Sequence, residues 1–370
     1  MLRTTSNFFE VESVAQAYTD ALVDFERETG CIIEDNYTGL PDDIWKTMVQ
    51  EDLAAGRLDV LFYYTTDENS AAILPHVTPM EEVLAAYPNA GLAASPLLAE
   101  ADGKTYAVPL NGYMIGLFIN RDQFELFGLE PPTDWGKLEA AIAKFREVGV
   151  TPIAAALSDY PNCLAEVAIL ASGSAADHRA RPASAADMPS SWAEGMDLLR
   201  RLHAMGAFPA NAGQITDTDA VRMFLEKDAA MRIDGTWFAG AIPPESWDST
   251  AVLPFPAHSP AADPAAVVGE MQMGFYISRS AWEDSQRREA AVKLVQALTT
   301  EEMRGKLSYA CGDAMLRSID AMLRDMRTLC APLGDAMIPE ARDAWFQAIP
   351  GIAEGTRDPA AVMRGLLGGQ

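Results

Sequence analysis

The segment LDVLFYY, residues 58–64, decides the fold class of this chain. It is a short, almost uninterrupted apolar run, which is typical of a buried strand. Two amphipathic helices are predicted before it, over 11–30 and 41–56, and the segment 31–38 between them has the composition of a short strand. With one more strand before the first helix, the order is β-α-β-α-β. Such an alternation predicts a mostly parallel sheet with helices on its faces.

Both helices carry sequence signals at their ends. The first ends at Gly30, the position where a glycine commonly terminates a helix. The second opens at Pro41 and ends at Gly56. Its predicted apolar stripe consists of Ile44, Trp45, Met48 and Val49.

The middle of the chain continues the alternation. Residues 104–120 have the pattern of two extended runs with a break at Asn111. A helix capped by Thr133 or Asp134 and a strand over 150–157 follow. We therefore expect further strands flanked by helices in this part of the chain.

The second half has two segments with loop composition. Residues 171–192 predict a long surface excursion, and residues 242–267 predict a proline-rich loop. The remainder, 299–370, has a mainly helical pattern in which Thr299 and Glu302 are spaced as a capping box.

The stretch AAMRIDGTWFAG, residues 229–240, combines a strand with an unusual tryptophan. The apolar run from Met231 to Ile233 predicts a strand, and Asp234-Gly235 predicts a turn. Trp237 comes just after that turn. A side chain of this size can hardly be packed from all sides there, so we ask what it contacts.

The composition excludes several partners. The formal net charge is −25, with 53 acidic against 28 basic residues, and an acidic surface repels phosphate backbones, so nucleic acid is not an expected partner. No apolar run has the length of about 18 residues that a membrane span needs. The start, MLRTTSNFFE, lacks the pattern of a signal peptide, so we expect a leader to be absent from this chain.

The cysteines and histidines are scattered rather than clustered. Their spacing matches no zinc or redox motif, which predicts no metal, no cofactor and free thiols at the cysteines. The chain also lacks the GxSxG, HExxH, GxxxxGK[ST] and GxGxxG motifs. We therefore expect a protein that is not an enzyme.

Several segments together resemble one family, the extracellular solute-binding proteins of ABC importers, in the group that mostly binds sugars and oligosaccharides. The resemblance covers essentially the whole chain. The segments that carry it include DGKTYAVP, GLFINRDQFELFGLEPPTDW, AAMRIDGTW and GFYISRSAW, in the family's order.

The resemblance implies an α/β fold of the two-lobed periplasmic-binding-protein type (type II), with the ligand in a cleft between lobes that crossing strands join. The N-terminal lobe would combine 1–111 with 269–312. The C-terminal lobe would combine 113–266 with 313–370. The family pattern also implies that the first strand is truncated, to LRTT before Ser6.

Ligands of open α/β sheets bind where loops follow the carboxyl ends of strands. Applied to this sequence, the rule and the resemblance together give the following candidate ligand-binding residues: Asn7, Phe8, Phe9, Glu10, Thr65, Thr66, Asp67, Asn111, Tyr113, Asp159, Tyr160, Trp237, Glu270, Met271 and Gln272.

Trp237 has a specific chemical role in this hypothesis. An indole offers a flat apolar surface to the C–H face of a sugar, while carboxylates and amides bind the rim of hydroxyls. The alternative is that Trp237 packs under its loop as a core residue. Tyr113 could equally lie in a buried crossing strand, and Asp67, Asp159 and Glu270 could be loop caps or surface charges.

The resemblance implies a substrate-binding component of an ABC importer. Such a protein captures a sugar or oligosaccharide by lobe closure and delivers it to the transmembrane subunits of the permease. It is a monomer and works outside the cytoplasm, either in the periplasm or anchored to lipid. Two alternatives stay open: a protein of the same fold that binds a polyamine or another cation, and a secreted carbohydrate-active enzyme.

Overall fold

The chain forms two compact units in the computed structural model. The structure describes residues 1–7, 12–36, 42–65, 70–92, 102–308 and 313–367. Unit 1 comprises Met1–Tyr113 and Met271–Ala310, and unit 2 comprises Met114–Glu270 and Cys311–Gln370. Two long strands, β4 (Ala107–Asn120) and β8 (Ala266–Ile277), contain residues of both units.

Unit 1 contains the strands that the opening of the sequence predicts. The strand order is β2 (Ile33–Asp35), β1 (Leu2–Thr5), β3 (Val60–Tyr64) and then β8. β1 is parallel to both β2 and β3, whereas β8 is antiparallel to β3. The β-α-β-α-β order is confirmed, and it places the carboxyl ends of β1 and β3 at the same edge of the sheet.

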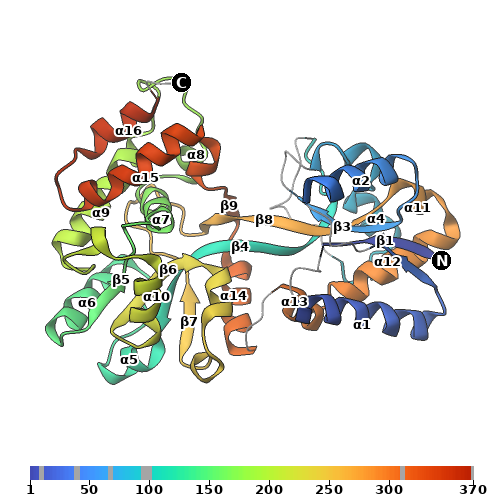
Figure 1. Cartoon of the computed structure of the whole chain (residues 1–370), viewed down its shortest axis with the longest axis horizontal. Coiled ribbons are helices and arrows are strands. Elements are labelled where there is room, and N and C mark those ends of the chain that lie inside the picture. The colour runs from blue at the N-terminus through green and yellow to red at the C-terminus, as the bar shows by residue number, and fades with distance from the viewer. Residues whose placement is uncertain (8–11, 37–41, 66–69, 93–101, 309–312, 368–370) are drawn as a thin grey trace. The chain divides into compact units, whose positions relative to one another are not determined.

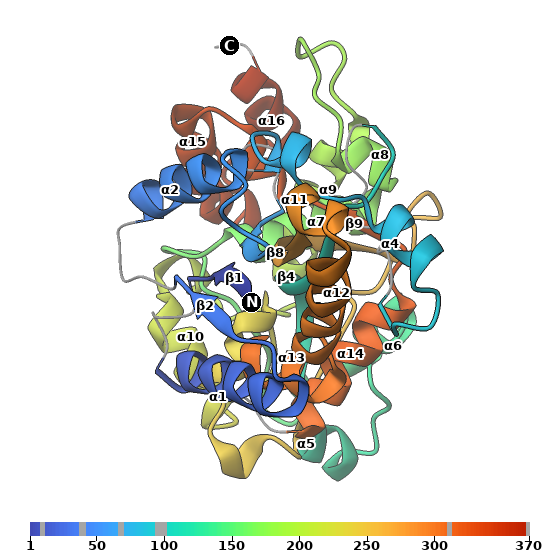
Figure 2. The same ribbon diagram turned by 90° about the vertical axis from the view of Figure 1, so that its right-hand side faces the viewer.

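Helices cover both faces of this sheet. α1 packs against α12 and α13, as Figure 2 shows. Gly30 and Gly56 follow α1 and α2 with φ of +68° and +67°, so both predicted terminations are confirmed. The helices of unit 1 are α1 (Glu12–Thr29), α2 (Asp42–Ala54), α4 (Met80–Ala86), α11 (Arg279–Glu283), α12 (Ser285–Leu298) and α13 (Glu301–Ser308).

Two predicted details of these helices are wrong. Ile44 and Met48 are 52% and 40% exposed, because the buried face of α2 repeats every four residues through Trp45, Val49 and Leu53. The cap of α13 is also displaced by one residue. The hydroxyl of Thr300, not Thr299, accepts from the backbone N–H of Met303.

A buried carboxylate explains the one charge in the segment 58–64. Asp59 accepts hydrogen bonds from the backbone N–H of Arg3 at 2.8 Å and from the guanidinium of Arg287 at 2.8 Å. It also forms an ion pair with the Arg3 side chain. A fully buried charge is tolerated only with such partners. Asp59 therefore joins β1 and α12 to the start of β3.

Unit 2 is built around a second set of strands (Figure 1). β6 (Ala229–Gly235) is antiparallel to β4 and parallel to β5 (Thr151–Ala154). β7 (Thr250–Leu253) pairs with β4, and β9 (Thr328–Cys330) pairs with β8. Because β5 and β6 are parallel, their carboxyl ends lie at the same edge.

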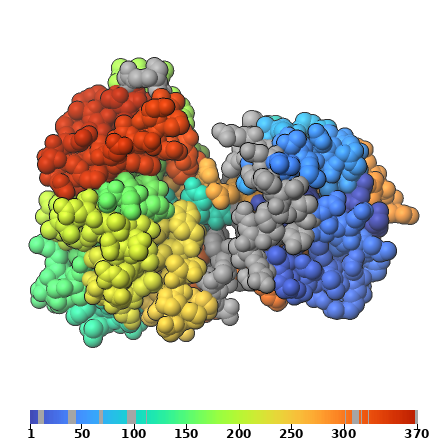
Figure 3. All heavy atoms as spheres, viewed as in Figure 1, coloured from blue at the N-terminus to red at the C-terminus, as the bar shows by residue number. Residues whose placement is uncertain are grey.

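The helices of unit 2 lie on both sides of β5 and β6. α7 packs on one side of these strands, and α6 and α10 pack on the other. The C-terminal helices α15 and α16 pack against α9, and Figure 3 shows their surfaces adjoining. These helices are α5 (Arg121–Leu126), α6 (Trp135–Glu147), α7 (Asn162–Ser172), α8 (Ala175–His178), α9 (Ser190–Ala204), α10 (Asp217–Leu225), α14 (Asp313–Asp325), α15 (Pro339–Ala353) and α16 (Pro359–Leu367).

The structure corrects three predictions about β4 and the segments that follow it. β4 is one continuous strand, without a break at Asn111. The segment 171–192 contains α8 and the buried side chains of His178 and Trp192, so it is not a simple surface excursion. The segment 242–267 contains β7, because its short apolar run finds an edge of β4 to pair with.

A buried polar cluster connects the segment around residues 333–334 to α7. The carboxylate of Glu166 accepts from the backbone N–H groups of Leu333 and Gly334, each at 2.9 Å. Its Oε2 also lies 2.9 Å from Nε2 of His178. The side chains of Glu166 and His178 are both buried. If Glu166 were removed, water could not reach the backbone N–H groups that it now accepts from.

Gly195 sets the distance between α7 and α9. A Cβ at this position would meet the backbone of Ile169 inside van der Waals contact. We expect Gly195→Ala to destabilise the protein by about 1–3 kcal/mol, because backbone cannot yield as a side chain can. The measurement is urea unfolding followed by circular dichroism.

Gly365→Ala in α16 is the matched control. No atom lies within 4 Å of the Cβ it would add, so the better helix former should stabilise by up to about 1 kcal/mol. Equal midpoints for the two variants would contradict the packing argument.

Candidate functional site

The first group of candidate residues lies at one edge of unit 1. Thr65 follows β3, and its backbone N–H donates to the carbonyl of Gln272 at 2.9 Å. Its hydroxyl donates to the carbonyl of Met271. The amide of Asn7, just after β1, lies 3.6 Å from the sulfur of Met273. The fold thus brings Asn7, Thr65, Met271 and Gln272 together at the carboxyl ends of β1 and β3.

Several other candidates cannot be placed. Phe8, Phe9, Glu10, Thr66 and Asp67 lie outside the described residues, as does the side chain of Asn111. Their assignment to the site stays a prediction.

The second group lies at the carboxyl edge of β5 and β6 in unit 2. Asp159 and Tyr160 follow β5, and Trp237 lies in a 3₁₀ turn, Thr236–Ala241, that follows β6. Tyr113 itself is a residue of unit 1 and lies within β4; the backbone N–H of the next residue, Met114, donates to the hydroxyl of Thr236 at 3.3 Å. Glu270 is half-buried within β8.

Trp237 is 44% exposed and lies against the backbone. A Cβ added to Gly235 would collide with three atoms of the six-membered ring of the indole. One side of this ring therefore lies over Gly235, which leaves room because it has no side chain. The strand runs on to Gly235, so the predicted turn at Asp234 is wrong, and the chain bends one residue later.

Asp159 and Tyr160 are held by local contacts. One carboxylate oxygen of Asp159 accepts from the backbone N–H of Asp217, the first residue of α10, at 2.8 Å. This is the loop-cap alternative that the sequence left open. Tyr160 is half-buried, with its hydroxyl 3.7 Å from the sulfur of Cys163. Burial raises the pKa of both groups, that of Cys163 to about 12, so both stay protonated near neutral pH.

A buried arginine lies at the same edge, and the sequence analysis missed it. The side chain of Arg232 is 2% exposed. Its Nε and Nη2 donate to one oxygen of Asp234 at 2.8 and 2.6 Å. Nη2 also donates to Asp217 at 2.5 Å. The sequence did contain a signal for this cluster, namely the charged Arg232 within the otherwise apolar segment 229–233. A buried arginine needs a carboxylate partner.

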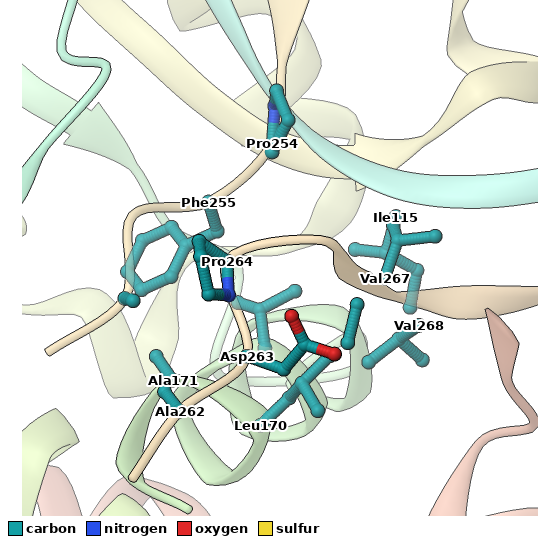
Figure 4. Close-up of a pocket in the computed structure, with 13 residues that line it drawn as sticks. Ile115, Leu170, Ala171, Pro254, Phe255, Ala262, Asp263, Pro264, Val267 and Val268 are labelled. Atoms are coloured by element: carbon teal, nitrogen blue, oxygen red, sulfur yellow. The ribbon is translucent and has the colours of Figure 1, made fainter. Parts of the chain in front are cut away.

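None of the candidate residues lines the small cavity of Figure 4. This cavity of about 20 Å³ holds roughly one water and lies in unit 2 between α7, the segment 254–264 and the nearby parts of β4 and β8. The carboxylate of Asp263 stands among apolar side chains there, as Figure 4 shows. A second, larger groove of about 450 Å³ runs along α9 to the start of α16.

His258 lines that larger groove and should give unit 2 a pH-dependent stability. Nη2 of Arg201 lies 2.7 Å from its Nε2, which accepts only when the ring is neutral. Partial burial and Arg201 lower its pKa, against the opposing carboxylates of Glu139 and Glu194. The unfolded chain therefore binds a proton first, near pH 6.5. Stability should be complete above that pH and fall as the pH drops towards the lower, native pKa.

His258→Gln tests this expectation. The variant lacks the titrating ring, so its unfolding midpoint should fall less than that of the unchanged protein between pH 7 and pH 5. Parallel pH profiles for the two proteins would contradict the assignment to His258.

The described residues contain no group of three or more His, Cys, Asp or Glu side chains arranged for a metal ion. Cys31, Cys163 and Cys330 carry free thiols, as predicted, while Cys311 lies outside the described residues. Among the helices that the structure describes, none is long and apolar enough to cross a membrane.

The family model for bacterial extracellular solute-binding proteins matches residues 20–312. The chain belongs to this family. A search of curated proteins found no match. The two-lobed α/β fold that the sequence predicts is confirmed by similar solved structures of solute-binding proteins.

Three similar structures illustrate the family fold. The bacterial solute receptor AcbH is 17% identical, with a TM-score of 0.73 over 99% of this chain and 96% of that one. A probable secreted solute-binding lipoprotein from Streptomyces coelicolor is 19% identical, with a TM-score of 0.74 over 99% and 97%. Apo RafE from Streptococcus pneumoniae is 18% identical, with a TM-score of 0.69 over 99% and 97%. At these identities the likeness concerns the fold alone.

Proposed function

We propose that this solute-binding protein captures a sugar or oligosaccharide outside the cytoplasm and delivers it unchanged to the permease of an ABC importer. One observation carries the proposal. Trp237 presents a half-exposed indole in the turn after β6, and the polar residues Asp159 and Tyr160 follow β5, the parallel neighbour of β6. A flat apolar surface next to hydrogen-bonding groups fits the alternating apolar and hydroxyl-bearing surface of a sugar ring.

The relatives support this ligand class. AcbH is described with an exclusive preference for β-D-galactopyranose. RafE is known in complex with raffinose. A further similar structure is that of a chitin oligosaccharide binding protein. In the proposal, the ligand of this chain is of the same class, and the candidate contacts are Asn7, Thr65, Met271 and Gln272 of unit 1 and the Trp237 turn of unit 2.

The charges of unit 2 favour an uncharged ligand over an anionic one. Arg232, which lies near the end of β6, is buried and bound to Asp234 and Asp217. Its guanidinium is thus committed to protein carboxylates, and Asp159, which accepts from the backbone N–H of Asp217, adds a further negative charge. A carboxylated sugar would meet repulsion there.

A thermal-shift screen tests the proposal. The panel contains galactose, raffinose, maltose and chitin oligosaccharides, with spermidine as a cationic ligand and glucuronic acid as an anionic one. A ligand at one hundred times its Kd should stabilise the native state by about 2.7 kcal/mol. Each sugar that raises the midpoint is then incubated with the protein and recovered; recovery of the intact sugar is expected. A shift with spermidine alone, or hydrolysis of the sugar, would overturn the proposal.

A further inference from the structure

The turn that carries Trp237 and the loop that carries Asp159 and Tyr160 are joined by one continuous set of contacts. The loop side begins at Asp159, whose carboxylate accepts from the backbone N–H of Asp217. The side chain of Asp217 in turn accepts from Nη2 of Arg232. Asp217 thus connects to the loop through its backbone and to the arginine through its carboxylate.

The turn side begins at the same guanidinium. Arg232 donates two hydrogen bonds to Asp234, and the other carboxylate oxygen of Asp234 accepts from the backbone N–H of Gly235 at 2.7 Å. Gly235 is the residue over which the indole of Trp237 lies. The end of β6 is therefore fixed at the position where the indole rests.

A second contact of Arg232 holds the turn through Phe238. The guanidinium carbon of Arg232 lies 5.0 Å from the ring centroid of Phe238, the residue after Trp237. Phe238 is buried and packs edge-to-face on Phe118 and Phe224. The cation–π contact thus anchors the 3₁₀ turn on a residue adjacent to the indole.

We propose that Arg232 is a positioning residue, whose buried guanidinium ties the Asp159–Tyr160 loop to the Trp237 turn and so fixes the indole for the ligand. This inference rests on the proposed function. The inference deepens the proposed function by assigning the orientation of the indole to a side chain that is itself buried. Its premise is geometric, since the links are hydrogen bonds, one cation–π contact and the close approach of the indole to Gly235, all between described residues of unit 2.

Asp217→Asn is the main test variant, because it weakens one link while the buried pair of Arg232 and Asp234 remains. Sugar affinity, measured by calorimetry with the tightest sugar of the panel, should fall by about three- to tenfold. In a Trp237→Ala background the same change should cost less than about twofold, because the indole it positions is gone. Equal losses in the two backgrounds would overturn the proposal.

Asp228→Asn is the matched control. Asp228 is exposed and precedes the opposite end of the same strand. Its substitution should leave the affinity within about twofold of the unchanged protein.

A second variant separates positioning from folding. Arg232→Met alone leaves Asp234 buried without a cation, which endangers the fold. The double variant Arg232→Met with Asp234→Asn removes both charges of the pair. It should fold and yet bind the sugar at least about tenfold more weakly. A double variant that binds as tightly as the unchanged protein would overturn the proposal.

A measurement without ligand keeps the inference separate from the proposed function. The seven tryptophans are labelled as 5-fluorotryptophan, and the ¹⁹F resonance of Trp237 is assigned by its absence in Trp237→Phe. This resonance should shift in Asp217→Asn and stay unchanged in Asp228→Asn. If no sugar binds, the proposed function fails, while the resonance still decides whether Arg232 positions the indole. An unshifted resonance contradicts the positioning role even where sugar binds.

Discussion

Replacement of Trp237 by alanine should weaken sugar binding by at least about 30-fold, equivalent to about 2 kcal/mol, while the protein stays folded. The loss follows from the shape of the site. The indole is the large aromatic surface that the structure exposes at the carboxyl edge of β5 and β6. Because the side chain is 44% exposed, its removal opens no enclosed cavity, and the unfolding midpoint should change little.

Trp237→Phe is the matched control for this prediction. A phenyl ring keeps a smaller apolar surface, so we expect an affinity between those of the unchanged protein and Trp237→Ala. Calorimetric titration measures the affinities, and thermal unfolding of the same samples measures the folded state. An alanine variant that binds the sugar with unchanged affinity would show that the indole does not meet the ligand.

Replacement of Glu166 by alanine should lower the free energy of unfolding by about 3–5 kcal/mol, more than the loss expected for Gly195→Ala. The carboxylate accepts from the amides of Leu333 and Gly334 and faces the ring of His178. Without it, these buried donors have no partner, and a cavity replaces the side chain. The expected consequence is loosening of the segment around residues 333–336 from α7, measurable as faster hydrogen exchange of the Leu333 and Gly334 amides.

Two comparisons give this second prediction its controls. Glu166→Gln retains an oxygen that can accept from the amides, so its loss of stability should be smaller. Glu194→Ala changes an exposed glutamate on α9 and should stay within about 0.5 kcal/mol of the unchanged protein. Similar urea midpoints for Glu166→Ala and Glu194→Ala would refute the role of the cluster.

The elements of the fold follow from local signals in the sequence. The glycines after α1 and α2 end those helices, and Asp134 caps α6 by accepting from the N–H of Lys137. Apolar periodicity and turn chemistry act between neighbouring residues, so they are visible without the fold. The buried face of α2 was harder to predict, because all four residues are apolar. Trp45 and Val49 pack in the core, whereas Ile44 and Met48 are exposed, and polarity alone does not distinguish the two pairs.

The polar interior could not be predicted, because its partners are distant in the sequence. Asp59 binds Arg287, and Glu166 binds the backbone at residue 333. Arg232 and Asp217 meet only when α10 packs against β6. Of the candidate site, the rule about strand ends accounts for the residues that follow β1, β3, β5 and β6, whereas Tyr113 lies within β4 and residues 270–272 lie within β8. It could not show that Asp159 is engaged as a cap or that Arg232 binds both Asp217 and Asp234.

The division of the chain has a consequence for the order of events during synthesis on the ribosome. Unit 1 needs residues 271–310 to complete its sheet and helices, and these emerge only after the whole segment 114–270 of unit 2. Unit 2 in turn waits for α15 and α16, which pack on α9. Neither unit can finish folding as a continuous N-terminal piece, although domains usually fold in that way. The nascent chain therefore holds two unfinished cores at once, the first completed near residue 310 and the second only close to the C-terminus.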